Sequence, residues 1–319
     1  RAYVSGFASQ WMNVGKIRNK GVEIAINSTN IASKSGFRWT TDFNISFIRN
    51  ELRALAGGAK EMMTTASWNS DYTGYDYTAR IGQSLGLIYG YVFDGVYQTS
   101  DFNVNAATGE YVLKEGVTDI TDHAGVAVKP GMVKYKDTDG DGVITTADRT
   151  VIGNGTPKWY GGITNTLSYK GVDLSFMFQF NYGNDVYNAT RLYASQTQDQ
   201  RSNLMAEVAD RWTATNASNK VPAWDGYIKN EIYSRFIEDG SFLRLKNVSL
   251  GYTLPSRSLR KAGISQMRVY VSADNIWTLT GYSGPDPEVS TRNSVLTPGF
   301  DWSAYPRAFG FTAGVNLTF

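Results

Sequence analysis

The residues of this sequence best suited to chemistry lie in one acidic segment, DTDGDGVITTAD, which runs from Asp137 to Asp148. Carboxylates at alternate positions can surround one hard cation, because Ca²⁺ prefers a shell of oxygen ligands. The spacing fits a calcium loop in which Gly142 supplies the sharp turn. The expected ligands are Asp137, Asp139, Asp141, the backbone carbonyl of Val143, and Asp148.

One position departs from the calcium loops of calmodulin-type sensors. Asp148 stands where those loops use a bidentate glutamate, and in this respect the segment resembles dockerin-type loops. No helical pattern flanks the segment, so we expect a structural calcium site rather than a calcium sensor. The alternative is an Asp/Gly-rich turn without an ion. Nothing in the sequence indicates an organic cofactor.

The composition argues against several other kinds of chemistry. The 319 residues carry 31 basic and 29 acidic side chains, a net charge of +2, so no nucleic-acid partner is expected. There is no cysteine and only one histidine, His123, which argues against thiolate or zinc sites and a histidine-based triad. A glycosidase needs two paired carboxylates, and nothing marks Asp286 and Glu288 as such a pair. We therefore do not expect an enzyme.

The elements that must position any site are β-strands, because apolar residues recur at every second position. This period places alternate side chains on opposite faces of a strand. In the clearest case, 37–48, aromatic and aliphatic residues alternate with charged and small polar ones. A charged face is hard to bury in a sandwich core but suits a water-filled lumen. The predicted strands are 20–29, 37–48, 158–169, 172–182, 241–253, 264–277 and 306–319.

The strand over 241–253 changes phase in its middle. Leu243 and Leu245 share one face, whereas Val248 and Leu250 would lie on the other face of a regular strand. We therefore predict a β-bulge near 246–247, which keeps all four on the apolar side. Charged residues on the polar faces are expected to pair with one another structurally, and they include Arg38, Asp42, Arg244 and Arg268.

The connections between the predicted strands alternate between short and long. The short connections are 30–36, 170–171 and 254–263, and the long ones are 51–157, 183–239 and 280–304. Outer-membrane barrels place short turns in the periplasm and long loops outside, and here all long connections fall on one side. This parity requires that the strand-like stretch 84–98 stays within the first loop. In the second loop, 203–212 reads as a surface helix.

Seven strands do not complete a barrel. Bacterial single-chain barrels have even numbers of strands, and an open sheet leaves two exposed edges. We therefore expect further strands upstream of Arg1. The alternative is a soluble β-domain that carries a calcium site and binds carbohydrate or acts as an adhesin. That alternative explains the acidic segment, but it does not explain an apolar stripe on every strand or the one-sided long loops.

Several segments together resemble one protein family. They are KIRNKGVEIAI, GYVFDGVYQ, VKYKDTDGDGVITTADRTVIGNGTPKWYGGI, GVDLSFMFQFNYGNDVYN, SFLRLKNVSLGYTLP and VYVSADNIWTLTGYSGPDPEV, followed by the final Phe319. From about Asn13 to Phe319, and in this order, the chain resembles the C-terminal third of the SusC/RagA family. Members of this family are TonB-dependent transporters of Bacteroidetes outer membranes.

The resemblance implies an all-β fold in which residues 1–319 form about seven strands of a large antiparallel transmembrane β-barrel of about 22 strands. The plug domain and the earlier strands are then absent from this chain. The implied activity is the import of oligosaccharides or oligopeptides, with the choice between them open and no substrate-binding residue assigned. The implied partners are the N-terminal remainder of the transporter, a SusD-like surface lipoprotein that acts as a lid, the TonB complex, outer-membrane lipid, and a glycan or peptide oligomer.

Overall fold

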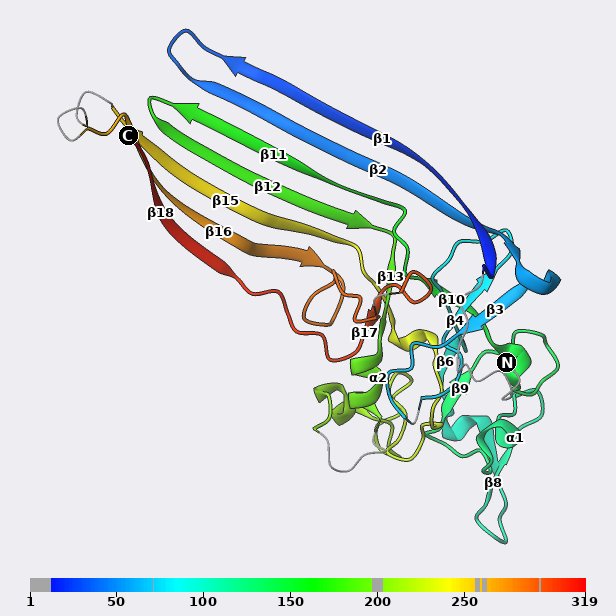
Figure 1. The fold of residues 1–319 in the computed structure, drawn as a ribbon. Coiled ribbons are helices and arrows are strands. Elements are labelled where there is room, and N and C mark those ends of the chain that lie inside the picture. Colours follow the sequence, from blue (N-terminus) through cyan, green and yellow to red (C-terminus); the bar gives the residue numbers. More distant parts are fainter. Residues whose placement is uncertain (1–12, 71, 197–202, 256–258, 260–262, 293) are drawn as a thin grey trace, which may run out of the picture.

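A computed structural model describes residues 13–319 except 71, 197–202, 256–258, 260–262 and 293. Its largest element is a seven-stranded antiparallel sheet with the strand order β1-β2-β11-β12-β15-β16-β18 (Figure 1). The strands are β1 (Gly15–Ala32), β2 (Arg38–Leu55), β11 (Trp159–Tyr169), β12 (Val172–Tyr182), β15 (Phe242–Leu254), β16 (Gln266–Thr280) and β18 (Gly310–Thr318). The seven predicted strands are thereby confirmed. β1 and β2 run several residues further than predicted, and the last strand, predicted over 306–319, begins only at Gly310.

Neighbouring strands are joined by tight turns at one end of the sheet and by long connections at the other (Figure 1). In the turn between β11 and β12, Lys170 and Gly171 both have positive φ, 48° and 86°. This is the backbone geometry of the tightest hairpin turns. The predicted turn 254–263 lies largely outside the described residues. All three long connections gather at one end, as the sequence predicts.

The register gives the sheet one apolar and one polar face. Directly paired residues of antiparallel strands lie on the same face. One row that crosses six strands consists of Ile26, Phe43, Ile163, Phe178, Leu245 and Trp277. The adjacent row on the opposite face consists of Ala25, Asn44, Gly162, Gln179, Arg244 and Thr278. The alternation seen in each strand is therefore coherent across the whole sheet.

The predicted bulge in β15 is what preserves this coherence. Against β12, the register passes from Leu245 to Asn247, so Lys246 has no partner there. The extra residue restores the phase, and Val248 pairs with Phe176 on the apolar face. Without the bulge, the second half of β15 would present its polar side chains on the apolar face.

A few polar side chains, among them Asn165 and its partner Thr41, interrupt the apolar face near the tight turns. Asn165 of β11 accepts hydrogen bonds at its Oδ1 atom from Trp39 Nε1 at 2.9 Å and from Thr41 Oγ1 at 2.7 Å. These bonds satisfy the amide oxygen on a face that is otherwise largely apolar. No described helix combines the length and hydropathy that a membrane-crossing helix requires.

The long connections fold into a domain with its own small sheets, beside the loop end of the large sheet (Figure 1). One sheet holds β3 (Glu61–Thr64), β4 (Tyr77–Arg80), β5 (Leu87–Gly90) and β10 (Thr150–Asn154), and another β13 (Asp185–Asn188), β14 (Ile237–Asp239) and β17 (Phe300–Asp301). Two strand pairs join β6 (Phe93–Val96) to β9 (Val133–Tyr135) and β7 (Phe102–Val104) to β8 (Tyr111–Leu113). Thus β5 and β6 keep the stretch 84–98 within the first loop, as predicted.

Helices are short and few in the described part of this loop domain. They are α1 (Thr121–Ala124), α2 (Ala189–Ser195) and 3₁₀ turns at Ala56–Gly58, Thr99–Asp101, Thr146–Asp148, Ala206–Asp210 and Ser234–Phe236. The predicted helix over 203–212 is reduced to the 3₁₀ turn Ala206–Asp210, because the backbone of the preceding Met205 is extended. The α-helix α2 lies upstream of this turn, in a segment for which no helix was predicted.

Buried aromatic rings form the core of the loop domain. Tyr91 and Tyr135 stack with ring centroids 4.8 Å apart, and Trp68 and Tyr72 stack at 4.3 Å. Tyr233 is 1% exposed and packs against Tyr135 of the first pair, so its ring also belongs to this core. Burial of such large rings supplies most of the driving force for ordering a domain with so little regular secondary structure.

Candidate functional site

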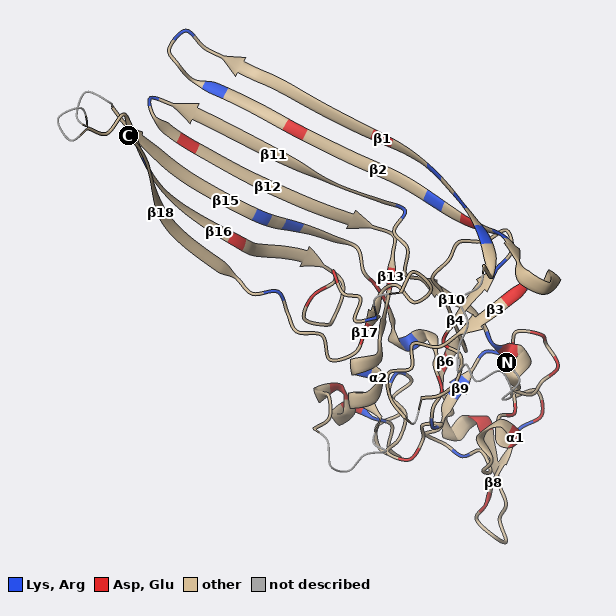
Figure 2. Cartoon of the chain, viewed as in Figure 1, with Lys and Arg blue, Asp and Glu red and all other residues tan. Residues whose placement is uncertain are grey.

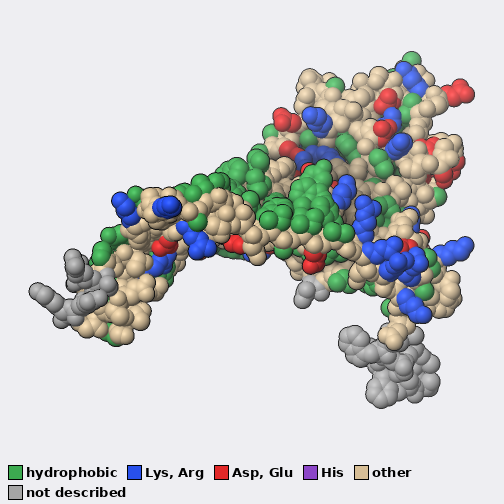
Figure 3. Space-filling model, turned by 90° about the horizontal axis from the view of Figure 1, so that it is seen from above, with side chains coloured by type: hydrophobic (Ala, Val, Ile, Leu, Met, Phe, Trp, Pro, Cys, Tyr) green, Lys and Arg blue, Asp and Glu red, His purple; other side chains and the backbone are tan. Residues whose placement is uncertain are grey.

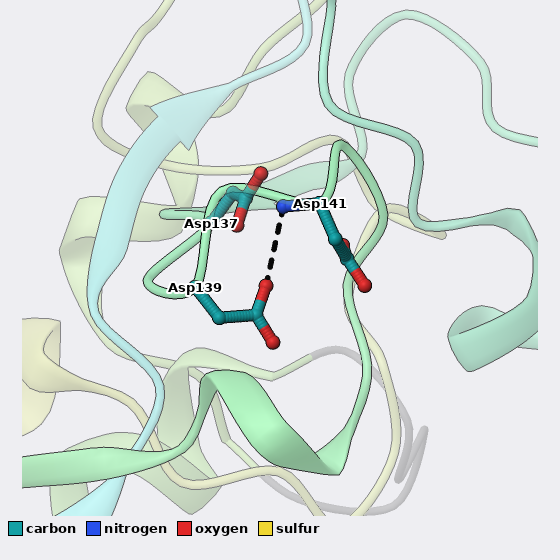
Figure 4. Close-up of side chains that lie close together, drawn as sticks. All are labelled: Asp137, Asp139 and Asp141. Atoms are coloured by element: carbon teal, nitrogen blue, oxygen red, sulfur yellow. Dashed lines mark hydrogen bonds between the residues drawn. The ribbon is translucent and has the colours of Figure 1, made fainter.

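The first three aspartates of the acidic segment lie together on one loop. Asp137, Asp139 and Asp141 each offer a carboxylate oxygen, and these atoms all lie within 4.8 Å of one another (Figure 4). The Asp137 carboxylate accepts hydrogen bonds from the amides of Gly140 and Gly142, at 2.6 and 2.8 Å. The loop is therefore shaped by its own side chains, with the three carboxylates gathered around one turn.

The electrostatics of these carboxylates differ because their hydrogen bonds differ. The amide hydrogen bonds from Gly142 and Gly140 hold the pKa of Asp137 below its usual value. At Asp139, the hydrogen bond from the Asp141 amide acts to lower the pKa, but desolvation and the neighbouring negative charges outweigh it and raise the pKa. Repulsion among the carboxylates is what a bound cation would relieve.

The Asp148 carboxylate, a further predicted ligand, does not belong to this group of three. Asp148 is fully buried, and its two carboxylate oxygens accept hydrogen bonds from the amides of Thr138 and Thr145, each at 2.8 Å. Val143 is exposed, and its amide donates to Asp141 Oδ1 at 2.9 Å. The carboxylate of Asp148 thus caps the 3₁₀ turn Thr146–Asp148. Through its bond to the Thr138 amide it also joins the end of the acidic segment to its beginning.

A second charged constellation lies on the polar face of the large sheet at its loop end. Arg244 of β15 is 2% exposed and contacts Asp286 Oδ1 at 2.6 Å and Glu288 Oε2 at 3.3 Å. Its Nε donates to Thr278 Oγ1 at 3.1 Å. Arg307 approaches Glu288 from the other side, at 3.2 Å. These contacts hold the loop 280–304 against the polar face.

Another ion pair spans three strands of the same face. Arg268 of β16 reaches across β15 to Asp173 of β12, with Nη2 to Oδ2 at 2.5 Å. Gly251 of β15 makes room for the guanidinium group, because a Cβ atom there would lie 2.3 Å from Arg268 Nη2. Structural pairing is therefore confirmed for Arg244 and Arg268. Arg38 and Asp42 form no ion pair among the described residues.

Asp286 and Glu288 have a structural role that the sequence did not reveal. Both carboxylates face Arg244, and Asp286 Oδ1 also accepts the Glu288 amide at 2.8 Å. The sequence signal was the Asp–Pro–Glu spacing in the third loop, but only the folded chain brings the guanidinium group between them. The pair anchors a loop and gives no support to a glycosidase.

Comparison with known proteins adds to this geometry. A scan against models of known protein families finds no match. The chain is 36% identical over 320 residues to TonB-dependent receptor P3 of Formosa agariphila, covering 99% of this chain and 30% of the relative. It is 27% identical over 314 residues to TonB-dependent receptor SusC of Bacteroides thetaiotaomicron, covering 98% of this chain and 27% of SusC. The chain belongs to the TonB-dependent receptors.

Solved structures agree with the fold of this TonB-dependent receptor chain. The structure of the RagAB peptide transporter matches with a TM-score of 0.72 and 24% identity, over all of this chain and 31% of that chain. The RagAB peptide importer in the "open-open" state gives a TM-score of 0.73 at the same identity. The predicted resemblance to SusC/RagA proteins and the predicted all-β barrel-type fold are confirmed. The chain spans about 30% of the length of these relatives.

Proposed function

We propose that this TonB-dependent receptor chain supplies seven membrane-spanning strands and the outer loops of a nutrient importer of the outer membrane. The single observation that carries the proposal is the two-faced sheet, with apolar rows on one side and polar rows on the other. In a transmembrane barrel the apolar face meets lipid and the polar face lines the lumen. The loop domain at one end then lies outside the cell.

The cargo is proposed to be an oligosaccharide or an oligopeptide. Relatives named SusC and RagAB support this class, and the RagAB structure is described as a peptide transporter. The importer is proposed to work with the N-terminal remainder of the receptor, a SusD-like surface lipoprotein as a lid, and the TonB complex. The chain itself performs no covalent step in this scheme, and the polar face and loops form the cargo path.

The decisive experiment isolates the receptor from detergent-solubilised outer membranes and identifies every co-purifying polypeptide by mass spectrometry. We expect an N-terminal portion of the same receptor and a surface lipoprotein in equal amounts. Uptake of labelled oligosaccharide and labelled oligopeptide by cells with and without the receptor then separates the two cargoes. If the chain purifies alone and folded without detergent, the importer is refuted and the soluble calcium-bearing binding domain takes its place.

The orientation of the sheet makes a direct mutational prediction. Phe178 lies on the apolar face and Met177, its neighbour in β12, lies on the polar face. A lysine at a lipid-facing midplane position of a barrel costs about 2–4 kcal/mol, whereas lumen positions tolerate charge. Phe178→Lys is expected to reduce the amount of folded receptor in the outer membrane, and Met177→Lys is expected to leave it near the native level. Heat-modifiable mobility of the full-length receptor measures both, and equal loss in the two variants would contradict this orientation.

We further propose that the acidic loop binds one structural Ca²⁺ ion. Supporting this is the grouping of the carboxylates of Asp137, Asp139 and Asp141, whose ligand atoms lie within 4.8 Å of one another. Desolvation and the neighbouring negative charges also raise the pKa of Asp139. Asp148 then supports the loop through its amide hydrogen bonds, and the Val143 carbonyl remains a proposed ligand.

Calcium is expected to stabilise the loop domain by about 2.7 kcal/mol at a concentration of about one hundred times Kd. Protection of residues 137–148 from hydrogen exchange, measured with calcium and with chelator, checks this. The variant Asp139→Asn/Asp141→Asn should lose the calcium response, and Asp122→Asn, which removes an exposed carboxylate elsewhere, should keep it. An unchanged exchange rate in native protein on adding calcium would show that this segment is an Asp/Gly-rich turn only.

A further inference from the structure

A cavity of about 440 Å³ lies at the loop end of the sheet, where β2 separates from β11. Their pairing ends at Ser46 and Tyr160, and residues 154–158, which lead into β11, form the opposite wall. Four cations line this cavity, which we call the basic pocket: Arg18, Lys20, Arg49 and Lys158.

The basic pocket carries a strong excess of positive charge. Its lining contains one carboxylate, Glu51, which already pairs with Arg53 at 2.6 Å. All four cations are exposed, and none forms an ion pair with a carboxylate among the described residues. Guanidinium groups bind phosphate through two parallel hydrogen bonds, and ammonium groups bind it as point charges. The pocket therefore suits a phosphorylated group.

The basic pocket continues the apolar face of the sheet without a break. Every second residue of β1 lies on this face, in the order Ile26, Ile24, Val22, Lys20 and Arg18. The neighbouring strand β2 changes from apolar to basic residues at the same height. There Phe47 pairs with Val22, and the next residue on this face, Arg49, pairs with Lys20. Figures 2 and 3 show basic residues gathered beside the apolar surface at this end.

The length of the apolar face places this change at a membrane boundary. Apolar positions on this face extend along β2 from Trp39 to Phe47, and the preceding Phe37 extends them to the tight turn. At about 3.3 Å per residue this stretch is about 33 Å long, and a strand tilt of about 40° reduces its height to about 25 Å. A barrel's apolar band has about this height. Lys20 and Arg49 are the next residues on this face after Val22 and Phe47. They then lie just outside the hydrocarbon core of the membrane, at the level of the lipid headgroups.

We propose that the basic pocket binds the phosphate of a glycolipid in the outer leaflet. This rests on the proposed function, which places the loop end of the sheet outside the cell. The apolar residues below the pocket contact the acyl chains. Ser84, Asn154 and Thr156 form a polar wall beside the cations, which hydrogen bonds to one another and to the Leu85 carbonyl hold in place. Imported cargo is a poor candidate for this site, because Arg18, Lys20 and Arg49 lie on the face opposite to the lumen.

Native mass spectrometry of the full-length receptor in detergent tests this proposal. The probes are monophosphoryl lipid A, its dephosphorylated form, and inorganic phosphate. Each cation near an anionic lipid surface contributes about a factor of five to binding. The variant Arg18→Gln/Lys20→Gln/Arg49→Gln is therefore expected to bind the phosphorylated lipid about one hundredfold more weakly. The control Lys34→Gln/Arg38→Gln/Lys170→Gln removes three cations at the opposite end of the sheet and should bind as the native receptor does.

The possible outcomes separate the sources of the anion. Equal binding of the phosphorylated and dephosphorylated lipids, or unchanged binding by the pocket variant, would overturn the proposal. Displacement of the lipid by millimolar phosphate would instead identify a site for a free anion. Heat-modifiable mobility verifies that the pocket variant is folded, and uptake is measured in parallel. Lipid binding without uptake of any cargo would refute the proposed import function alone.

Discussion

Replacement of Arg244 by methionine is expected to destabilise the attachment of loop 280–304 by about 3–5 kcal/mol. Arg244 is 2% exposed and Asp286 is 7% exposed, so the variant leaves a buried carboxylate without its main partner. Breaking a buried ion pair costs about this much, because the remaining charge is poorly solvated. Arg307 still lies 3.8 Å from Asp286 and 3.2 Å from Glu288, which favours the lower end of the range.

The measurement is limited proteolysis of the full-length receptor, with the cleavage rate within 280–304 as the readout. Lys129→Met is a matched control, since it breaks the exposed pair between Lys129 and Asp225, and such pairs contribute about 0–1 kcal/mol. The triple variant Arg244→Met/Asp286→Asn/Glu288→Gln should recover part of the loss, because it removes the uncompensated charges. If Arg244→Met is cleaved no faster than the native receptor, the loop is held by other contacts.

The strands of the large sheet were predictable because each face meets a different environment. Apolar and polar residues then alternate over many positions, as in Phe43 to Phe47 of β2, and a single exception is informative. The loss of phase around Lys246 required an extra residue, and the register places it there. The outer ends of β1 and β2 were missed, because their pairing continues after the apolar residues give way to charged ones such as Lys20 and Arg49. The last strand was predicted to begin at 306, but β18 begins at Gly310.

The loop domain was predictable only in outline. Its strands are two to five residues long, too short for a period to emerge, and many of their partners are distant in sequence. The strand β13, for example, pairs with β17 of the third loop, and neither segment alternates. Such pairing between different loops depends on the packing of buried rings. Trp68 of the first loop and Phe300 of the third, for example, have ring centroids 6.1 Å apart.

The candidate sites were likewise predictable where their residues are close in sequence, and not where the fold brings distant residues together. Asp137, Asp139 and Asp141 follow one another in the sequence, so their spacing sufficed to predict that they lie together. The position of Asp148 depended on whether its carboxylate turned towards the cluster or towards the amides of the loop, which spacing does not decide. The basic pocket left a readable signal in β1, because Arg18 and Lys20 continue the face of Val22 and Ile24. That Lys158 lies in the wall of the same pocket could not be predicted, because only the fold brings it close to β1 and β2.

The loop domain is expected to lose stability as the pH rises towards neutral, because of Asp76. This side chain is 1% exposed, and burial raises its pKa from 3.8 to about 7. The amides of Ala66 and Asp76 and the charges of Arg149 and Arg292 act in the opposite direction but do not compensate. Because the folded state holds the proton more tightly, this contribution is fully present below about pH 4 and is lost as the pH rises through about 7. It amounts to about 4 kcal/mol at most.

Asp76→Asn is expected to abolish this part of the pH dependence. The amide oxygen of asparagine can still accept the hydrogen bond from the Ala66 amide, which lies 2.7 Å from Asp76 Oδ1, and it carries no charge at any pH. Hydrogen exchange of residues 61–90 in the full-length receptor measures the effect as the ratio of native to variant rates at each pH, which cancels the intrinsic pH dependence of exchange. We expect the native loop to exchange faster than the variant at pH 8 and at a similar rate at pH 4.5. A ratio that stays constant from pH 4.5 to 8 would mean that Asp76 titrates near its ordinary value, and that Arg149 and Arg292 neutralise it in the folded state.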